Sequence, residues 1–139
     1  MKTKLLFLCT GNSCRSQIAE GLLRHLAGDQ FEVFSAGVEP SRVHPMSILV
    51  MQEVGIDISD QHSDDVLDYL NAGIDIVISV CDHAAQTCPA FPGSVERIHW
   101  SVKDPYHGWD MDESKLPDYR RTRDDLKARI RDFLITQER

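Results

Sequence analysis

The chain has 139 residues, of which 42% are hydrophobic and 27% charged, a length and balance typical of one globular domain, here residues 1–139. Its net charge of −7 argues against nucleic acid or an anionic membrane as main partner, so an anionic substrate would need a local pocket that overrides the overall field. No apolar run is long enough to span a membrane, and the N-terminal apolar stretch is too short for a signal peptide. We therefore expect a cytoplasmic protein whose four cysteines stay reduced.

The first part of the chain alternates between strand-like and helix-like patterns. The continuous apolar run at 4–9 predicts a strand buried on both faces. Residues 15–28 show helical spacing of apolar side chains, with a glycine as the stop. A second strand is expected at 31–37, and a second helix at 45–55, where proline suits the first turn.

The same alternation continues to the C-terminus. Ser63 is expected to cap a short helix through residue 73, followed by strands at 74–81 and 95–100. A long amphipathic helix is predicted from Leu116 to the end. Alternating strands and helices predict an α/β fold with a parallel sheet that is covered on both sides.

The loop between the first strand and the first helix has the features of an anion site. Cys9 ends the strand and the helix begins near Arg15, so residues 10–14 must form a tight turn. Such a loop presents unpaired N–H groups at the positive end of the helix dipole. Gly11 and Asn12 take positive φ at little cost, so the amides can converge, and Arg15 adds a planar fork for two oxygens.

The same field favours the thiolate of Cys9, which we interpret as a nucleophile to whose sulfur Ser16 can donate a hydrogen bond. Two alternatives are a core thiol, which explains neither the loop nor Arg15, and a four-cysteine zinc site, whose spacings depart from the usual short knuckle. We interpret Cys14 as a packing residue whose amide matters more than its sulfur. The predicted substrate-binding residues are Thr10, Gly11, Asn12, Ser13, Cys14, Arg15 and Ser16, and no metal or cofactor is expected.

A second pair of cysteines follows the third predicted strand. Cys81 ends that strand as Cys9 ends the first, so both sulfurs are expected at the same edge of the sheet. Cys88 lies seven residues beyond Cys81, which is about 10 Å along a helix, whereas a disulfide needs Cα atoms about 4.4–6.8 Å apart. Either the two thiols are unrelated, or the segment between them unwinds during function. With Cys9, three thiols arranged for sequential exchange explain the pattern better.

Asp104 precedes Pro105 after the fourth predicted strand. Proline biases Asp104 toward an extended conformation that can hold the carboxyl over the same sheet edge, where it could protonate a leaving oxygen. Asp-Pro is also a common turn start, and without the anion loop that alternative would be preferred.

Over essentially its full length the chain resembles the thioredoxin-coupled arsenate reductases, which share the low-molecular-weight tyrosine phosphatase fold. The residues that carry the resemblance are "CTGNSCRSQIAEG", "SAGVEP", "EVGIDIS", "SD" at 63–64, the pair Cys81 and Cys88, and "DP" at 104–105. The resemblance implies a three-layer α-β-α fold with a four-stranded parallel sheet of order 2-1-3-4, and we expect a monomer.

The resemblance also implies a mechanism. Cys9 attacks arsenate held by the loop amides and Arg15, while Asp104 supplies a proton to the departing oxygen. Cys81 then attacks Cys9 and arsenite leaves; Cys88 attacks Cys81 as the segment loops out. Thioredoxin reduces the resulting Cys81–Cys88 disulfide. By the same analogy Asn12 organises the loop and Ser16 steadies the Cys9 thiolate.

Two features depart from the family pattern. Some members carry a potassium ion whose ligand positions fall here on Asn12, Glu20, Ser35, His62 and Asp64, but His62 replaces a threonine. The aromatic residue after Asp-Pro, in "DPYHGW", is more typical of the phosphatase branch.

Three alternatives remain open on sequence grounds. A tyrosine phosphatase needs only Cys9, Arg15 and Asp104, but leaves Cys81 and Cys88 without a role. A non-catalytic oxyanion or redox module would tolerate loss of Asp104, which the chain retains. Finally, relatives with this fold are also coupled to glutaredoxin, so the sequence does not choose between the two reductants.

Overall fold

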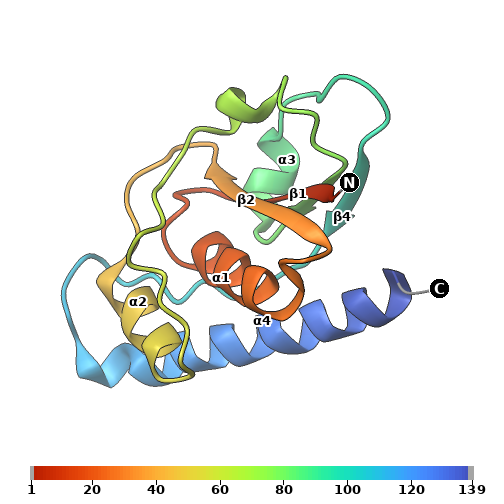
Figure 1. The fold of residues 1–139 in the computed structure, drawn as a ribbon. Helices are drawn as coiled ribbons and strands as arrows, with labels where there is room; N and C mark the ends of the chain where they lie inside the picture. Colours follow the sequence, from red (N-terminus) through yellow and green to blue (C-terminus); the bar gives the residue numbers. More distant parts are fainter. Residues whose placement is uncertain (1, 138–139) are drawn as a thin grey trace.

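A four-stranded parallel sheet forms the centre of the protein, whose computed structural model describes residues 2–137 (Figure 1). The strands are β1 (Thr3–Cys9), β2 (Phe31–Gly37), β3 (Ile76–Ser79) and β4 (Glu96–His99). Their spatial order is β2-β1-β3-β4, and every neighbouring pair is parallel. The fold class and the strand order predicted from the sequence are therefore confirmed.

Helices cover both faces of this sheet, as Figure 1 shows. On one face lie α1 (Arg15–Ala27), α2 (Pro45–Gln52) and the long α4 (Leu116–Gln137), and α3 (Asp82–Thr87) lies on the other. Two 3-10 helices, Val66–Tyr69 and Glu113–Lys115, lie within the connections. In residues 2–137, no helix is long and apolar enough to cross a bilayer.

The core is built around β1, which lies between β2 and β3. Leu5, Leu6, Phe7 and Leu8 have no solvent exposure, because side chains on both faces of this strand are covered by helices. On one face α1 and α4 contribute Ile18, Leu22, Tyr119, Leu126 and Ile130 to the same cluster. The predicted continuous burial of this strand is thus confirmed.

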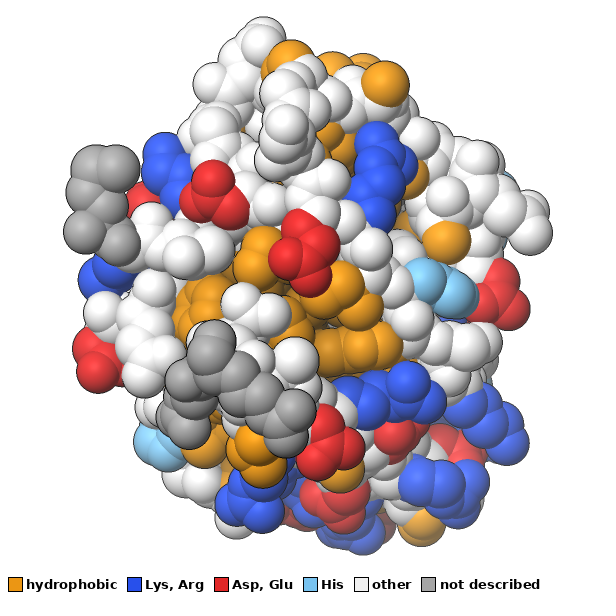
Figure 2. Space-filling model, turned by 90° about the vertical axis from the view of Figure 1, so that its right-hand side faces the viewer, with side chains coloured by type: hydrophobic (Ala, Val, Ile, Leu, Met, Phe, Trp, Pro, Cys, Tyr) orange, Lys and Arg blue, Asp and Glu red, His pale blue; other side chains and the backbone are white. Residues whose placement is uncertain are grey.

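The edge strand β4 is less covered. Three of its four residues are solvent-exposed and the fourth is half-buried, and within residues 2–137 no further strand pairs with its outer edge. Where β4 approaches α4, Ile98, Trp100 and Phe133 line a shallow groove of about 320 Å³. Figure 2 shows apolar side chains among charged ones on the side of the molecule where β4 and the end of α4 lie in Figure 1.

The register brings the carboxyl ends of the strands together. Cys9 pairs with Gly37, Leu8 with Ser79, and Ser79 with His99. At Gly37 a Cβ atom would lie 2.5 Å from the carbonyl oxygen of Thr10, so only glycine lets the end of β2 come this close to the loop after β1. Loops after β1, β2 and β3 therefore meet at one edge.

Several predicted boundaries differ from the structure. The short helix expected after Ser63 is present as a 3-10 helix, Val66–Tyr69, but its predicted cap and length are wrong. The Ser63 hydroxyl donates to the carbonyl of Gly11, and Asp65 caps the helix instead. The third strand is four residues long rather than eight, and α2 ends at Gln52 rather than residue 55. The final helix is described to Gln137, and residues 138–139 of the predicted element lie outside the described residues.

Candidate active site

The loop after β1 is held from outside by its carbonyl groups. Glu39 N–H donates to the Thr10 carbonyl at 2.8 Å, Ser41 N–H to that of Gly11 at 3.0 Å, and His44 N–H to that of Ser13 at 3.1 Å. The carbonyl of Asn12 accepts from the side-chain amide of Gln17 at 3.0 Å. Four successive carbonyls are thus fixed by the segment after β2 and by α1.

This arrangement turns the loop amides toward one another. In a trans peptide the N–H points opposite to the preceding carbonyl, so amides 11–14 face inward when carbonyls 10–13 face outward. None of these four amides donates to another described residue of the chain. Asn12 has φ of 48°, the one positive value at a described non-glycine residue, as expected from its tolerance of this region. Gly11, for which the sequence suggested the same, is not among the positive-φ residues. The loop can therefore surround a tetrahedral oxyanion at the N-terminus of α1.

Cys9 lies at the base of this loop. Its side chain is almost fully buried, and its Sγ lies 2.8 Å from the Ser16 hydroxyl. Ser16 in turn accepts a hydrogen bond from the Asn12 side-chain amide at 2.7 Å. The predicted contact between Cys9 and Ser16 is therefore present.

Arg15 and Asp104 face each other across the mouth of the loop. One guanidinium nitrogen of Arg15 donates to the Val102 carbonyl at 3.0 Å, and another lies 3.4 Å from an Asp104 carboxyl oxygen. The Asp104 side chain is about half exposed, with the other oxygen accepting from Tyr106 N–H at 2.9 Å. Asp104 thus makes both the turn and the approach to the loop that the sequence suggested as alternatives.

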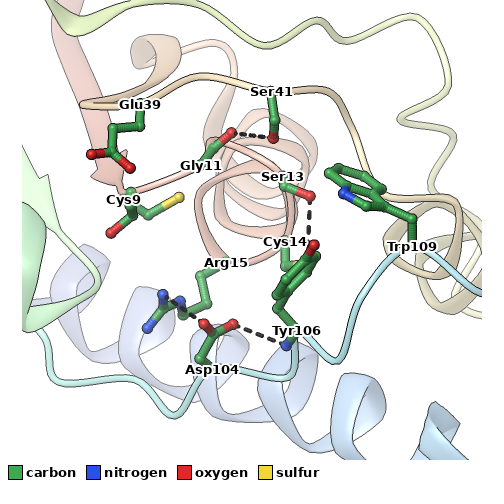
Figure 3. A pocket seen from close by; sticks show the side chains of 11 residues that line it. Cys9, Gly11, Ser13, Cys14, Arg15, Glu39, Ser41, Asp104, Tyr106 and Trp109 are labelled. Atoms are coloured by element: carbon green, nitrogen blue, oxygen red, sulfur yellow. Dashed lines mark hydrogen bonds and ion pairs between the residues drawn. The ribbon is translucent and has the colours of Figure 1, made fainter.

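A cavity of about 350 Å³ opens above the loop (Figure 3). Cys9, Arg15 and Asp104 line it on one side, and the aromatic rings of Tyr106 and Trp109 form a wall on the other. The Trp109 ring is stacked on His44 at 5.0 Å between centroids, and Arg42 lies 4.2 Å above it. This wall was not predicted, although its residues follow Asp-Pro in "DPYHGW".

The Cys14 sulfur belongs to the packing of the loop. Its Sγ lies 3.8 Å from the Tyr119 hydroxyl, and burial raises the pKa of Cys14 to about 11. At neutral pH this thiol is protonated and a poor nucleophile. The geometry agrees with an interpretation of Cys14 as scaffold.

Cys81 and Cys88 bracket α3. The Cys81 sulfur caps this helix by accepting from Ala84 N–H at 3.3 Å, and it also lies 3.3 Å from the hydroxyl of Thr10, the neighbour of Cys9. Cys88 follows the last helical residue and is half-buried beside Arg97 and His99; burial raises the pKa of its thiol. Cys81 is thus next to the anion loop, while the intact helix separates it from Cys88.

Residues 4–139 match the sequence pattern of a known protein family, the low molecular weight phosphotyrosine protein phosphatases. The chain belongs to this family. Among its relatives, an arsenate reductase of Halalkalibacterium halodurans is 46% identical over 97% of this chain and 97% of its own length.

Two solved structures are also similar to this chain. An arsenate reductase in the phosphate binding state is 36% identical, with a TM-score of 0.81 and 98% of each chain covered. A thioredoxin-dependent arsenate reductase of Corynebacterium glutamicum is 29% identical, with a TM-score of 0.76 over 97% of this chain and 61% of the other.

The five positions at which some members of the family hold potassium do lie near one another, but their oxygens are already engaged. Glu20 accepts from Ser35 and from the Arg24 guanidinium. The Asp64 carboxylate is bound by the Tyr69 hydroxyl at 2.6 Å and lies 2.9 Å from the His62 ring. Residues 2–137 contain no group of three His, Cys, Asp or Glu side chains arranged for a metal. His62 places a ring nitrogen where the family pattern has a threonine hydroxyl, so this set of five positions differs from that pattern in the group it presents.

Proposed function

We propose that this protein reduces arsenate to arsenite through a relay of three thiols. The observation that carries the proposal is the position of Cys81, whose sulfur touches Thr10 in the anion loop immediately beside Cys9. A phosphatase has no use for a second thiol at this place, whereas a thiol relay needs one. The arsenate reductases among the relatives support the same conclusion.

In the first step the Cys9 thiolate attacks the arsenic of an arsenate held by amides 11–14 and Arg15. Oxygen leaves as water, its proton supplied by Asp104, and a bond between sulfur and As(V) remains. Because Asp104 is half exposed, it can take up another proton from solvent. Thr10, Gly11, Asn12, Ser13, Cys14, Arg15 and Ser16 form the binding loop in this proposal.

In the second step the Cys81 thiolate attacks the Cys9 sulfur. The electron pair of the sulfur–arsenic bond stays with arsenic, so As(V) becomes As(III), arsenite leaves, and a Cys9–Cys81 disulfide forms. The Cys88 thiolate then attacks the Cys81 sulfur and releases Cys9 as a thiolate. The protein has thereby lost two electrons, stored as a Cys81–Cys88 disulfide.

The last exchange requires α3 to open. Cys88 follows Cys81 by seven positions, with the six residues of α3 between them, which is about 10 Å of helical rise and beyond the span of about 4.4–6.8 Å that a disulfide allows. The helix has six residues and only Ala84 is buried, so little packing opposes its unwinding.

Thioredoxin is the reductant that we propose, by analogy with the thioredoxin-dependent relative from Corynebacterium glutamicum. The opened segment would present the Cys81–Cys88 disulfide to a dithiol partner, whose oxidation restores both thiols. Arsenite release with thioredoxin and its reductase, compared with glutaredoxin and glutathione, tests this choice; equal or faster turnover with glutathione would refute it.

Substitution of the relay thiols tests the reaction itself. Cys81→Ser and Cys88→Ser should abolish multiple-turnover arsenate reduction with thioredoxin, and Cys88→Ser should stop at a Cys9–Cys81 disulfide visible by mass spectrometry. Cys14→Ser is the matched control and should keep most of the activity. Normal turnover of either relay variant would show that the three-thiol scheme is wrong.

A slow hydrolysis of aryl phosphates is a second activity that we propose, because Tyr106 and Trp109 wall the cavity above Cys9. Phosphate matches arsenate in shape and charge, and an aromatic leaving group can pack on these rings. With p-nitrophenyl phosphate, Cys9→Ser should remove the activity and Cys81→Ser should leave it intact. Equal loss in both variants would refute it.

A further inference from the structure

The thiol of Cys88 lies at the end of α3, in surroundings that oppose its ionisation. Pro89 follows it and restricts Cys88 to the extended conformation that it has, with φ of −61° and ψ of 126°, so the chain leaves the helix here. The side chain is half-buried, and burial raises the pKa of the thiol. The carboxyl end of a helix also disfavours a negative charge. Because thiol–disulfide exchange proceeds through the thiolate, this sulfur needs a positive charge nearby.

The carbonyl oxygen of Pro89 brings an arginine to this thiol. It accepts one hydrogen bond from Cys88 Sγ at 3.4 Å and another from a guanidinium nitrogen of Arg97 at 3.1 Å. Both side chains also line one pocket of about 170 Å³, together with residues of β3, β4 and α3. When the thiol loses its hydrogen, the sulfur becomes an acceptor beside a cation. Arg97 thus acts against the rise in the pKa of Cys88 that burial causes, through its charge and through its contact with the sulfur.

On β4, Arg97 is the charged side chain that faces this thiol. Neighbouring Glu96 lines the groove against α4 instead, since successive residues of a strand point to opposite faces of the sheet. His99 shares the face of Arg97, but one of its ring nitrogens lies 2.8 Å from a β3 hydroxyl and the other 2.8 Å from the Asp82 carboxylate. Both nitrogens are therefore engaged, and His99 is not placed to take the proton of Cys88.

The other segments around the sulfur bring no further cation to it. Residues 89–95 and β3 carry no charged side chain. Asp82 and His83 lie in the first turn of α3, next to Cys81 and at the opposite end of the helix from the sulfur. In residues 2–137 no carboxylate lies within ion-pair distance of Arg97, so its charge is not neutralised by another side chain.

We propose that Arg97 is the charge partner of Cys88, and that its guanidinium stabilises the thiolate that attacks the Cys81 sulfur. The inference rests on the relay proposed above. In that step the proton of Cys88 passes to solvent and a bond forms between the sulfurs of Cys88 and Cys81. The Cys9–Cys81 bond breaks and Cys9 leaves as a thiolate, so the exchange needs no other oxidant or reductant. With Arg97 beside it, Cys88 ionises before α3 opens.

The ionisation of Cys88 can be measured without arsenate. The rate of Cys88 alkylation by iodoacetamide, read by peptide mass spectrometry, is followed against pH in the full chain. Arg97→Gln removes the charge and should raise the midpoint pH by roughly half a unit to one unit, whereas Arg97→Lys keeps the charge and should stay close to the wild type. Arg131→Gln, at an exposed position of α4 on the opposite face of the sheet, is the matched control and should not move the midpoint (Figure 1).

A purely structural role of Arg97 would give a different result. Arg97 is exposed, so its variants should fold, and a looser end of α3 would change access to the sulfur and thus the alkylation rate at every pH, but not the midpoint. Added salt should screen the pair, raising the wild-type midpoint toward that of Arg97→Gln while the variant hardly moves. An unchanged midpoint in Arg97→Gln, or equal midpoints in Arg97→Gln and Arg97→Lys, would overturn the inference.

Measurements of the relay separate this inference from the proposed function. In Arg97→Gln the pH midpoint for conversion of the Cys9–Cys81 disulfide into the Cys81–Cys88 disulfide should rise by the same amount as the alkylation midpoint. An alkylation shift without this rise would overturn the part of Arg97 in the relay. Full arsenate turnover by Cys88→Ser, together with an alkylation shift in Arg97→Gln, would refute the relay and leave the pairing of Arg97 with Cys88 in place. No shift in Arg97→Gln, with Cys88→Ser inactive, would refute the pairing alone.

Discussion

The anion loop and the α3 segment lie at the same edge of the sheet but are built in opposite ways. Around the loop, carbonyls 10–13 are held by residues 39–44 and by Gln17, the Asn12 side chain is bound to Asp64 N–H, and Asn12 and Ser16 have no exposure. In α3, only Ala84 is buried, and the helix ends directly at Cys88. In the proposed mechanism one part binds a substrate of fixed shape and the other changes shape, and the packing of the two parts differs in the same sense.

The largest contrast is expected in hydrogen exchange. Amides of α1 pack on the core and should exchange only by global opening, whereas those of α3 open locally, so their protection factors should differ by at least about 10³-fold. Oxidation of Cys81 and Cys88 should raise exchange across residues 82–87 further, as the helix unwinds. Cys88→Ser, which cannot form this disulfide, is the control. Protection in α3 that equals α1, or that does not change on oxidation, would contradict the division of tasks.

Loosening the loop should damage substrate binding and the first chemical step. Asn12→Ala removes the side-chain bonds to Ser16, Ser35 and Asp64 and places alanine at φ of 48°. Because small misplacements of a catalytic group are costly, kcat/KM for arsenate should fall about 10²-fold. Asn71→Ala, at an exposed turn, should leave kcat/KM unchanged. A drop below threefold in Asn12→Ala would mean that the loop holds its shape without this residue.

Loosening α3 should speed a reaction step, whereas loosening the loop should slow one. Asp82, the first helical residue, lies 2.8 Å from the His99 ring and accepts from the Ser101 hydroxyl at 2.9 Å, which ties the helix start to the segment after β4. Asp82→Ala removes both bonds and should speed conversion of the Cys9–Cys81 disulfide into the Cys81–Cys88 disulfide about 3–10-fold. Quenching with an alkylating agent followed by mass spectrometry measures this rate.

The neighbouring position supplies the comparison for Asp82→Ala. His83 is exposed on the same turn of α3, and its side chain has no hydrogen-bond partner among the described residues. His83→Ala should therefore leave the conversion rate as in the wild type. A rate for Asp82→Ala that is unchanged or slower would show that this tether does not restrain the helix.

The sequence predicted the sheet and much of the site because their signals are local. These signals come from adjacent residues in the chain. They are the apolar run before Cys9, the glycine and asparagine after it, and the cysteine that follows the apolar residues of β3. The aromatic wall was missed, since Trp109 lies in an irregular loop without periodicity. Ser63 was assigned to a helix cap because its partner, the Gly11 carbonyl, lies far away in sequence and appears only in the fold.

The smallest effect that we expect is a loss of stability at acidic pH, caused by protonation of His44 beside the anion loop. Its ring accepts from Met46 N–H at 3.1 Å and lies 2.7 Å from the Gly108 carbonyl, so it is neutral, and burial lowers the pKa of His44. The unfolded chain therefore binds this proton more readily, and stability should fall as the pH drops below about 6.5.

This pH effect should be specific to the wall beside the anion loop. His44→Asn keeps a capping side chain for α2 but does not titrate, so the melting temperature of the wild type should drop about 2–4 °C more than that of the variant between pH 7 and 5. Because Trp109 is stacked on His44, its fluorescence should change over the same pH range in the wild type alone. Identical pH profiles for the two proteins would show that protonation of His44 does not disturb the loop. If so, the stability of this side of the site would depend on backbone bonds such as that from His44 N–H to the Ser13 carbonyl, which carry no titratable group.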